Sequence, residues 1–146
     1  MTKNILWLLL VAVVVVGAVL VLKPELAESL VPSLWAGKHK AAVRQRATEM
    51  VGYLTENNLD GCVALTDPAF VRQHGVNGVK IRFGLLHLAA KAGKLDAAAV
   101  QLGEVRLTPD NQRAEIDMSL RMQGEWKAQN PGRWVRVDDQ WYYCPE

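Results

Sequence analysis

The sequence predicts an α+β fold: a transmembrane helix at the N-terminus, then several helices, then an antiparallel sheet on which the helices pack. Three observations support this prediction. An unbroken apolar run occupies residues 5–22. Apolar side chains then recur at three- and four-residue steps as far as Gly93, which is the helical period. After Lys94 the pattern changes to alternation, and helices followed by strands are the order typical of an α+β domain.

The run at residues 5–22, ILWLLLVAVVVVGAVLVL, contains no charged residue and no proline. A bilayer core of about 30 Å requires roughly 20 apolar helical residues, with about 17 as the lower limit. Residues 1–22 are therefore interpreted as a transmembrane anchor. Two alternatives stay open: a buried helix of a soluble core, and a cleaved signal peptide, whose apolar region usually spans about 7–15 residues.

The remaining chain divides into a juxtamembrane linker over 23–37, which Pro24, Pro32 and Gly37 interrupt, and one domain over 38–146. The whole chain has 146 residues and a formal net charge of +2. Its basic residues form no stripe, so the composition argues against nucleic-acid binding. Basic residues beyond the run slightly favour a cytoplasmic domain. The short tail before the N-terminal apolar run is typical of a signal-anchor, and an extracytoplasmic, periplasmic domain is therefore expected.

Helical periodicity and capping residues divide the first part of the domain into four helices. Asp67 is a good N-cap and Pro68 suits the first helical position, while Asn58 and Asn77 are expected to cap the helices that follow them. The expected helices span residues 38–57, 59–65, 68–74 and 77–93. In the last of them the apolar side chains expected to form the buried arc are Val79, Phe83, Leu85, Leu86, Leu88, Ala89 and Ala90.

Alternation predicts four strands in the second part, over residues 97–108, 113–127, 133–137 and 140–144. The second is the clearest, with even-numbered apolar residues from Ala114 to Trp126 on one face and mostly charged residues on the other. A half-buried antiparallel strand gives this pattern. Because the strand is unusually long, a bend at Gly124 by a β-bulge is expected.

The order of elements and the ending RWVRVDDQWYYC resemble the nuclear transport factor 2-like superfamily, as does the segment LDGCVALTDPAF at 59–70. The resemblance covers about residues 39–145 and implies a cone-shaped α+β barrel, in which helices lie across a strongly curved sheet. The superfamily includes ketosteroid isomerase, the SnoaL-like cyclases and small anchored bacterial domains. Fold alone does not fix function, so the side chains that face into the cone decide the interpretation.

The expected inner face offers hydrocarbon and aromatic rings and no acid, base or nucleophile. Aromatic-lined pockets with few polar groups are common small-molecule sites, although ordinary core packing explains the same residues. The candidate ligand pocket comprises Met118, Leu120, Met122, Trp126, Trp134, Trp141 and Tyr143.

The titratable residues support a catalytic site less well than the apolar and aromatic residues support a ligand pocket. Asp117 is expected on the outer sheet face, His39 near the linker and His87 in solvent. A catalytic alternative would use groups at the mouth of the cone, namely Asp60, Asp67 or His74. The histidines are too widely spread for a metal site, and neither a metal nor another cofactor is expected.

Cys62 and Cys144 are the only two cysteines. In an oxidising compartment they are candidates for a disulfide, and the alternative is two separate buried thiols.

The sequence therefore favours a membrane-anchored, non-catalytic domain that binds a small apolar ligand or a membrane-proximal partner protein. The alternative is a lyase or isomerase of the SnoaL or ketosteroid-isomerase type with a hydrophobic pocket. A homodimer is also expected through the outer sheet face, where charges of both signs can pair across a two-fold axis: Glu115, Asp117, Arg121 and Glu125.

Overall fold

The computed structural model describes residues 24–145, with side chains from Pro32 onward. The chain divides into two compact units, 1–37 and 38–146, and the second contains the sheet. Among residues 24–145, no helix has both the length and the apolar composition needed to cross a bilayer. The predicted anchor at 1–22 lies outside the described residues.

Helix α2 spans Pro24–Thr55, so the chain is helical where the sequence predicted an interrupted linker, and Pro32 lies inside the helix. The helix ends at Thr55, two residues before the predicted end at Asn57, whose φ of 58° is left-handed. The Asn58 amide donates to the Tyr53 carbonyl and the Asn57 amide to Leu54, which satisfies the last turn.

Three further helices, α3 (Leu59–Ala64), α4 (Pro68–His74) and α5 (Val76–Ala92), follow closely on one another. The predicted caps of the first two are confirmed, because the Asn58 and Asp67 side chains accept hydrogen bonds from Gly61 and Ala69. Helix α5 differs from the prediction. It begins after Gly75, whose φ is 74°, and Asn77 lies inside it rather than capping it.

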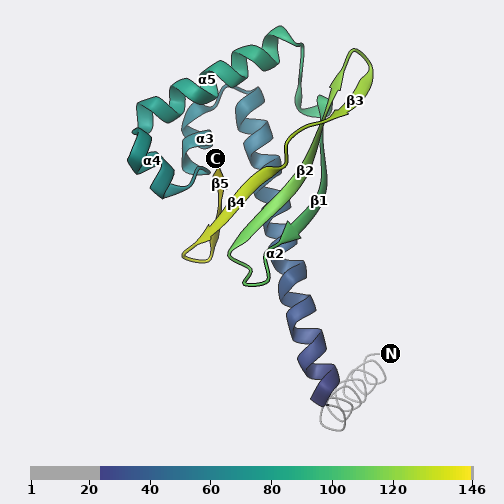
Figure 1. The fold of residues 1–146 in the computed structure, drawn as a ribbon. Helices are drawn as coiled ribbons and strands as arrows, with labels where there is room; N and C mark the ends of the chain where they lie inside the picture. Colours follow the sequence, from purple (N-terminus) through teal and green to yellow (C-terminus); the bar gives the residue numbers. More distant parts are fainter. Residues whose placement is uncertain (1–23, 146) are drawn as a thin grey trace, which may run out of the picture. The chain divides into compact units, whose positions relative to one another are not determined.

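A five-stranded antiparallel sheet follows the short 3₁₀ helix η1 (Ala97–Ala99). The strands β1, β2, β4 and β5 lie in that order, and β3 pairs with the far end of β2. A bulge between Leu102 and Val105 shifts the register of β1 on β2. Figure 1 shows α2 crossing behind this curved sheet. The strands span Val100–Leu107, Arg113–Met122, Glu125–Ala128, Gly132–Val137 and Gln140–Cys144.

The predicted strand over 113–127 is a hairpin instead. Strand β2 stops at Met122, and Gln123 and Gly124 both adopt positive φ, at 54° and 86°. Two successive left-handed residues make the tight turn whose twist suits a two-residue hairpin. The chain then returns as β3, with Met122 opposite Glu125 and Arg121 opposite Trp126. The bend predicted at Gly124 is therefore a complete reversal of direction.

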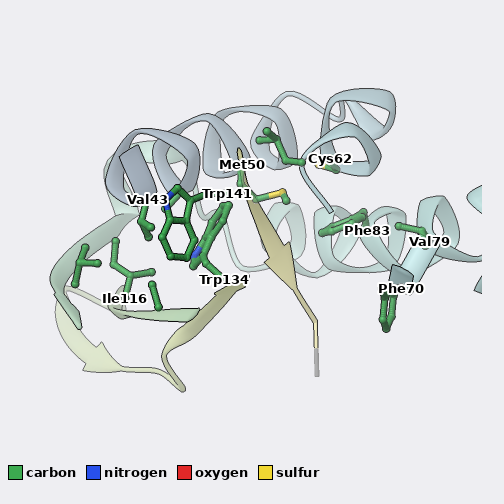
Figure 2. Close-up of a cluster of buried hydrophobic side chains, with 13 residues drawn as sticks. Val43, Met50, Cys62, Phe70, Val79, Phe83, Ile116, Trp134 and Trp141 are labelled. Carbon is green, nitrogen blue, oxygen red and sulfur yellow. The ribbon is translucent and has the colours of Figure 1, made fainter. Parts of the chain in front are cut away.

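The hydrophobic core lies between the sheet and the helices (Figure 2). One part contains Val43 and Met50 of α2 with Ile116, Trp134 and Trp141 of the sheet. Burying a large apolar side chain stabilises a fold by about 1.5–3 kcal/mol. The other part lies among the shorter helices and comprises Cys62, Leu65, Phe70, Val79 and Phe83.

Helix α5 buries a narrower arc than the sequence predicted. Val79 and Phe83 are buried, at 1% and 3% exposure. Leu86, also expected in the arc, is 47% exposed, and Ala89 is exposed. Leu85 and Leu88 were expected to widen the buried arc, yet they are 63% and 61% exposed. They lie on the far side of the helix from Phe83, and no described residue covers them.

Candidate functional site: the inner face of the sheet

The inner face of the sheet is built from cross-strand rows of side chains that point toward α2. Ala114 pairs with Trp134, and Trp134 pairs with Tyr143, which aligns three side chains across β2, β4 and β5. The next row joins Val105, Ile116 and Gly132. Directly opposed residues on antiparallel strands share a face, so these rows define one continuous surface.

Core side chains fill only part of this surface. Trp134, Trp141 and Ile116 are 3%, 2% and 0% exposed, and Val43 of α2 is buried with them. Further along β2, Met118 and Leu120 are half-buried and Met122 is 42% exposed. We call Met118, Leu120 and Met122 the open patch. Its three side chains are apolar and uncharged, and none of them belongs to the buried core cluster. At its edge, Glu125 and Lys127 of β3 lie opposite Met122 and Leu120, so the hairpin places these two exposed charged residues on the inner face, and Glu125 is not on the outer face as predicted.

Trp126 does not join the other six predicted pocket residues. It lies opposite Arg121, and Arg121 belongs to the odd-numbered, outer face of β2. The hairpin at Gln123 and Gly124 reverses the chain, so the even numbering that placed Trp126 inward no longer holds. Its side chain is 48% exposed.

A buried polar atom lies where the filled core meets the open patch. The indole Nε1 of Trp134 has no hydrogen-bond partner among the described residues. A Cβ built on Gly132 would lie 3.6 Å from this nitrogen and 3.7 Å from Met118 Sδ. The N–H group therefore lies beside Gly132, which has no side chain, and beside the first residue of the open patch. A buried donor without an acceptor costs about 1–3 kcal/mol.

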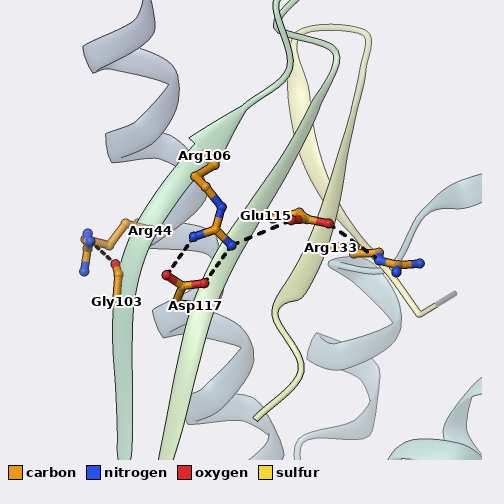
Figure 3. A network of polar contacts seen from close by, with 6 residues as sticks. All are labelled: Arg44, Gly103, Arg106, Glu115, Asp117 and Arg133. Atoms are coloured by element: carbon orange, nitrogen blue, oxygen red, sulfur yellow. Dashed lines mark hydrogen bonds and ion pairs between the residues drawn. The ribbon is translucent and has the colours of Figure 1, made fainter. Parts of the chain in front are cut away.

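Carboxylates of β2 lie on the opposite, outer face of the sheet (Figure 3). Asp117 accepts two hydrogen bonds from Arg106, at 2.7 and 2.8 Å, and these bonds hold the pKa of the carboxyl below its ordinary value. Glu115 lies between Arg106 and Arg133, at 3.7 and 3.9 Å. Both carboxylates serve as partners of guanidinium groups and lie away from the open patch.

A hollow of about 770 Å³ lies along this outer face. Most of its polar wall comes from charged and hydroxyl side chains of β1, β2, β4 and the turn after β1, namely Arg106, Thr108, Arg113, Glu115 and Arg133. The charges are of both signs, and Arg106 is already neutralised by two carboxylates.

His39 is a buried titratable residue of the inner side that sequence reasoning missed. It is 8% exposed; Trp141 Nε1 donates to its Nδ1 at 3.4 Å, and Arg136 Nη1 lies 3.3 Å from its Nε2. A signal for its burial is present in the sequence, because His39 continues the apolar stripe of Val43, Ala47 and Met50 by one helical turn. Burial, with Arg136 and Lys38 nearby, lowers the pKa of His39, and Asp139 opposes them.

The stability of the domain should therefore fall on mild acidification. The pKa of His39 is lower in the fold than its ordinary value of 6.5, so its contribution is complete above about pH 6.5 and is lost as pH falls toward the folded pKa. Urea unfolding at pH 7.5 and pH 5.5 measures the loss. His39→Asn keeps an acceptor for Trp141 without a titrating ring, so this variant should lose less stability than the wild type between the two pH values. Equal losses would contradict the assignment.

The residues proposed for a catalytic rim are not brought together. Asp60 pairs with Lys80 at 2.6 Å and is 85% exposed. Asp67 caps α4, with its carboxylate accepting from the Ala69 amide at 3.0 Å. His74 stacks on Phe70, with ring centroids 4.2 Å apart. Each side chain therefore has a local structural role, and none of the three faces the open patch. Asp67 in addition lines the hollow along the outer face.

The two cysteines are free thiols. Cys62 is buried in α3, and burial raises its pKa to about 11. Cys144 lies opposite Arg133 on the outer face, because Tyr143 beside it pairs with Trp134 on the inner face. The structure thus contains the two separate thiols and not the disulfide. Across residues 24–145, no three His, Cys, Asp or Glu side chains gather as metal ligands.

Comparisons with known proteins bear on the fold. No protein-family profile and no curated protein sequence matches the chain. A solved structure from Campylobacter jejuni, described as an NTF2-like transpeptidase, is similar with a TM-score of 0.56 and 10% sequence identity. The similarity covers 70% of this chain and 97% of that one. The chain therefore contains an α+β fold of the nuclear transport factor 2-like type.

Proposed function

We propose that this chain is a membrane-anchored, non-catalytic domain that binds a small apolar ligand on the inner face of its sheet. The nuclear transport factor 2-like fold is shared by isomerases and by non-catalytic binding domains. The side chains at the site therefore decide between the two classes. Membrane attachment in this proposal rests on the apolar run at 5–22 alone.

The observation that carries the proposal is the unpaired, buried N–H of Trp134 beside the open patch. Apolar sites commonly orient a ligand through one or two polar groups. A ligand with a ring or short hydrocarbon body would rest on Met118 and Leu120. Its single acceptor, such as a carbonyl oxygen, would take the hydrogen bond that Trp134 offers, and the cost of the unpaired donor would be relieved.

The isomerase alternative requires a base whose lone pair can reach a substrate proton. Glu125 lies opposite Met122 on the inner face, but it is exposed to water on the short strand β3. His39 is the buried inner-side candidate, and an N–H donor faces each of its ring nitrogens. The Nδ1 lone pair is directed at Trp141 and the other nitrogen lies against a guanidinium. Neither nitrogen is directed toward the open patch, which favours binding over proton transfer.

The proposal can be tested with two naphthalenes that differ in one acceptor. The full chain, in nanodiscs and labelled with 5-fluorotryptophan, is titrated with 2-acetylnaphthalene and with 2-ethylnaphthalene. The Trp134 fluorine resonance, assigned by its loss in Trp134→Phe, should shift with the ketone and shift less with the hydrocarbon. Trp134→Phe should weaken ketone binding by about 2–12-fold, the effect of one hydrogen bond.

Trp126→Phe is the matched control, because Trp126 lies on the outer face and should leave ketone binding unchanged. Equal weakening by Trp134→Phe and Trp126→Phe would mean that the naphthalenes bind without selectivity. An unmoved Trp134 resonance at saturating ketone would place the binding elsewhere and overturn the proposal.

A further inference from the structure

Helix α5 presents a second apolar stripe that the fold does not use. Ile81, Leu85 and Leu88 are 65%, 63% and 61% exposed. Their spacing of four and then three residues repeats every seven, and Gly78 and Ala92 extend it in both directions. This narrow stripe has the form of a coiled-coil seam, in which such residues occupy the a and d positions of a heptad. Figure 1 shows α5 at the edge of the domain.

Four residues on this face of α5 have the spacing that accommodates one side chain of a neighbouring helix in coiled-coil packing. Ile81, Gly84, Leu85 and Leu88 stand at positions i, i+3, i+4 and i+7, the four residues that receive one knob in coiled-coil packing. They line a shallow hollow of about 330 Å³, together with Asn57 and His87. Gly84 leaves the hollow open because it has no side chain.

The charges beside the stripe define the partner. Arg82 and Lys91 take the e and g positions that flank the seam, and α5 contains no Asp or Glu. Arg82 contacts the Phe70 ring and donates to the Pro145 carbonyl; both are uncharged, so its charge remains. Lys80, further from the seam, is the basic residue that pairs with Asp60. Residues at e and g set partner choice in coiled coils.

We infer that the Ile81–Leu85–Leu88 stripe is a docking surface for an amphipathic helix of a partner protein with acidic flanking residues. A second copy of the chain is disfavoured, because two α5 helices packed on this seam would bring only basic side chains together. The inference is independent of the proposed ligand site, since α5 contributes no residue to the open patch.

Two designed peptides of three heptads test the inference. Both have Leu at a and d; one has Glu at e and g and the other has Lys there. The full chain in nanodiscs of neutral lipid should bind the Glu peptide about tenfold more tightly than the Lys peptide, because like charges at a rim are costly. The difference in affinity between the two peptides should decrease as salt is added, since exposed charges are screened.

Two variants complete the test. Leu85→Asp should abolish binding of both peptides without unfolding the domain, because the side chain is largely exposed. The double variant Arg82→Glu, Lys91→Glu should reverse the preference and bind the Lys peptide more tightly. Equal binding of the two peptides by the wild type, or the same preference after charge reversal, would overturn the inference.

Other occupants of the stripe give distinct results, and each would contradict the proposal. A chain dimer that Leu85→Asp dissociates would identify a second copy. Slower amide hydrogen exchange across residues 76–92 in nanodiscs containing phosphatidylglycerol, together with no binding of either peptide, would identify a lipid surface.

Discussion

Replacing Ile116 with alanine should lower the free energy of unfolding by about 2–5 kcal/mol, the range for truncating a fully buried aliphatic side chain. Ile116 is 0% exposed and lies at the centre of the inner sheet face, opposite Val105 and Gly132. Its loss removes apolar contacts and leaves a cavity that a closely packed core cannot close fully. Urea unfolding followed by tryptophan fluorescence measures the effect, since Trp134 and Trp141 lie in the same core.

Leu120→Ala is the matched control, on the same strand and the same face. Leu120 is half-buried and outside the buried core cluster, so its truncation should cost about 1 kcal/mol, as is typical of point substitutions. The contrast tests whether the inner face is filled at one end and open at the other. Similar losses at both positions would show that the open patch is covered like the core, and would remove the space in which a ligand is proposed to bind.

The fold class and most helix boundaries could be predicted because they depend on local chemistry. Asn58, Asp67 and Gly93 act at the positions where their capping tendencies place them. The inner face of β2 followed from alternation, because a wrong register would bury several charged side chains. These features rest on neighbouring residues, which a sequence displays directly.

Three other features could not be predicted from the sequence: one hairpin turn, the buried side of α5 and the contacts of His39. Gln123 and Gly124 form a hairpin turn without the Asn-Gly pair that usually signals one, so Trp126 was placed on the wrong face. Helix α5 has two apolar stripes, and periodicity alone does not decide which one the fold buries. His39 was overlooked because its partners, Arg136 and Trp141, come from the far end of the chain.

Replacing Gly61 with alanine should destabilise the domain by about 1–3 kcal/mol, as overpacking typically does. A Cβ at Gly61 would lie 2.7 Å from the Cγ and Cδ2 atoms of Tyr53, closer than packed carbon atoms approach. Cγ is the base of the ring and moves only with the backbone of α2 or with a new rotamer. The substitution therefore separates α3 from α2, although alanine is otherwise the better helix former.

Gly84→Ala separates this steric effect from the general preference of helices for alanine. A Cβ at Gly84 would meet only Leu59 Cδ1, at an ordinary 3.9 Å, so the variant should gain about 0.5–1 kcal/mol. Opposite signs for two helical Gly→Ala changes, measured by the same urea titration, would assign the loss at Gly61 to the Tyr53 contact. A gain at both positions would instead mean that the Tyr53 ring is free to move away, and that α3 is held mainly by its contacts with α5, such as the Asp60–Lys80 ion pair.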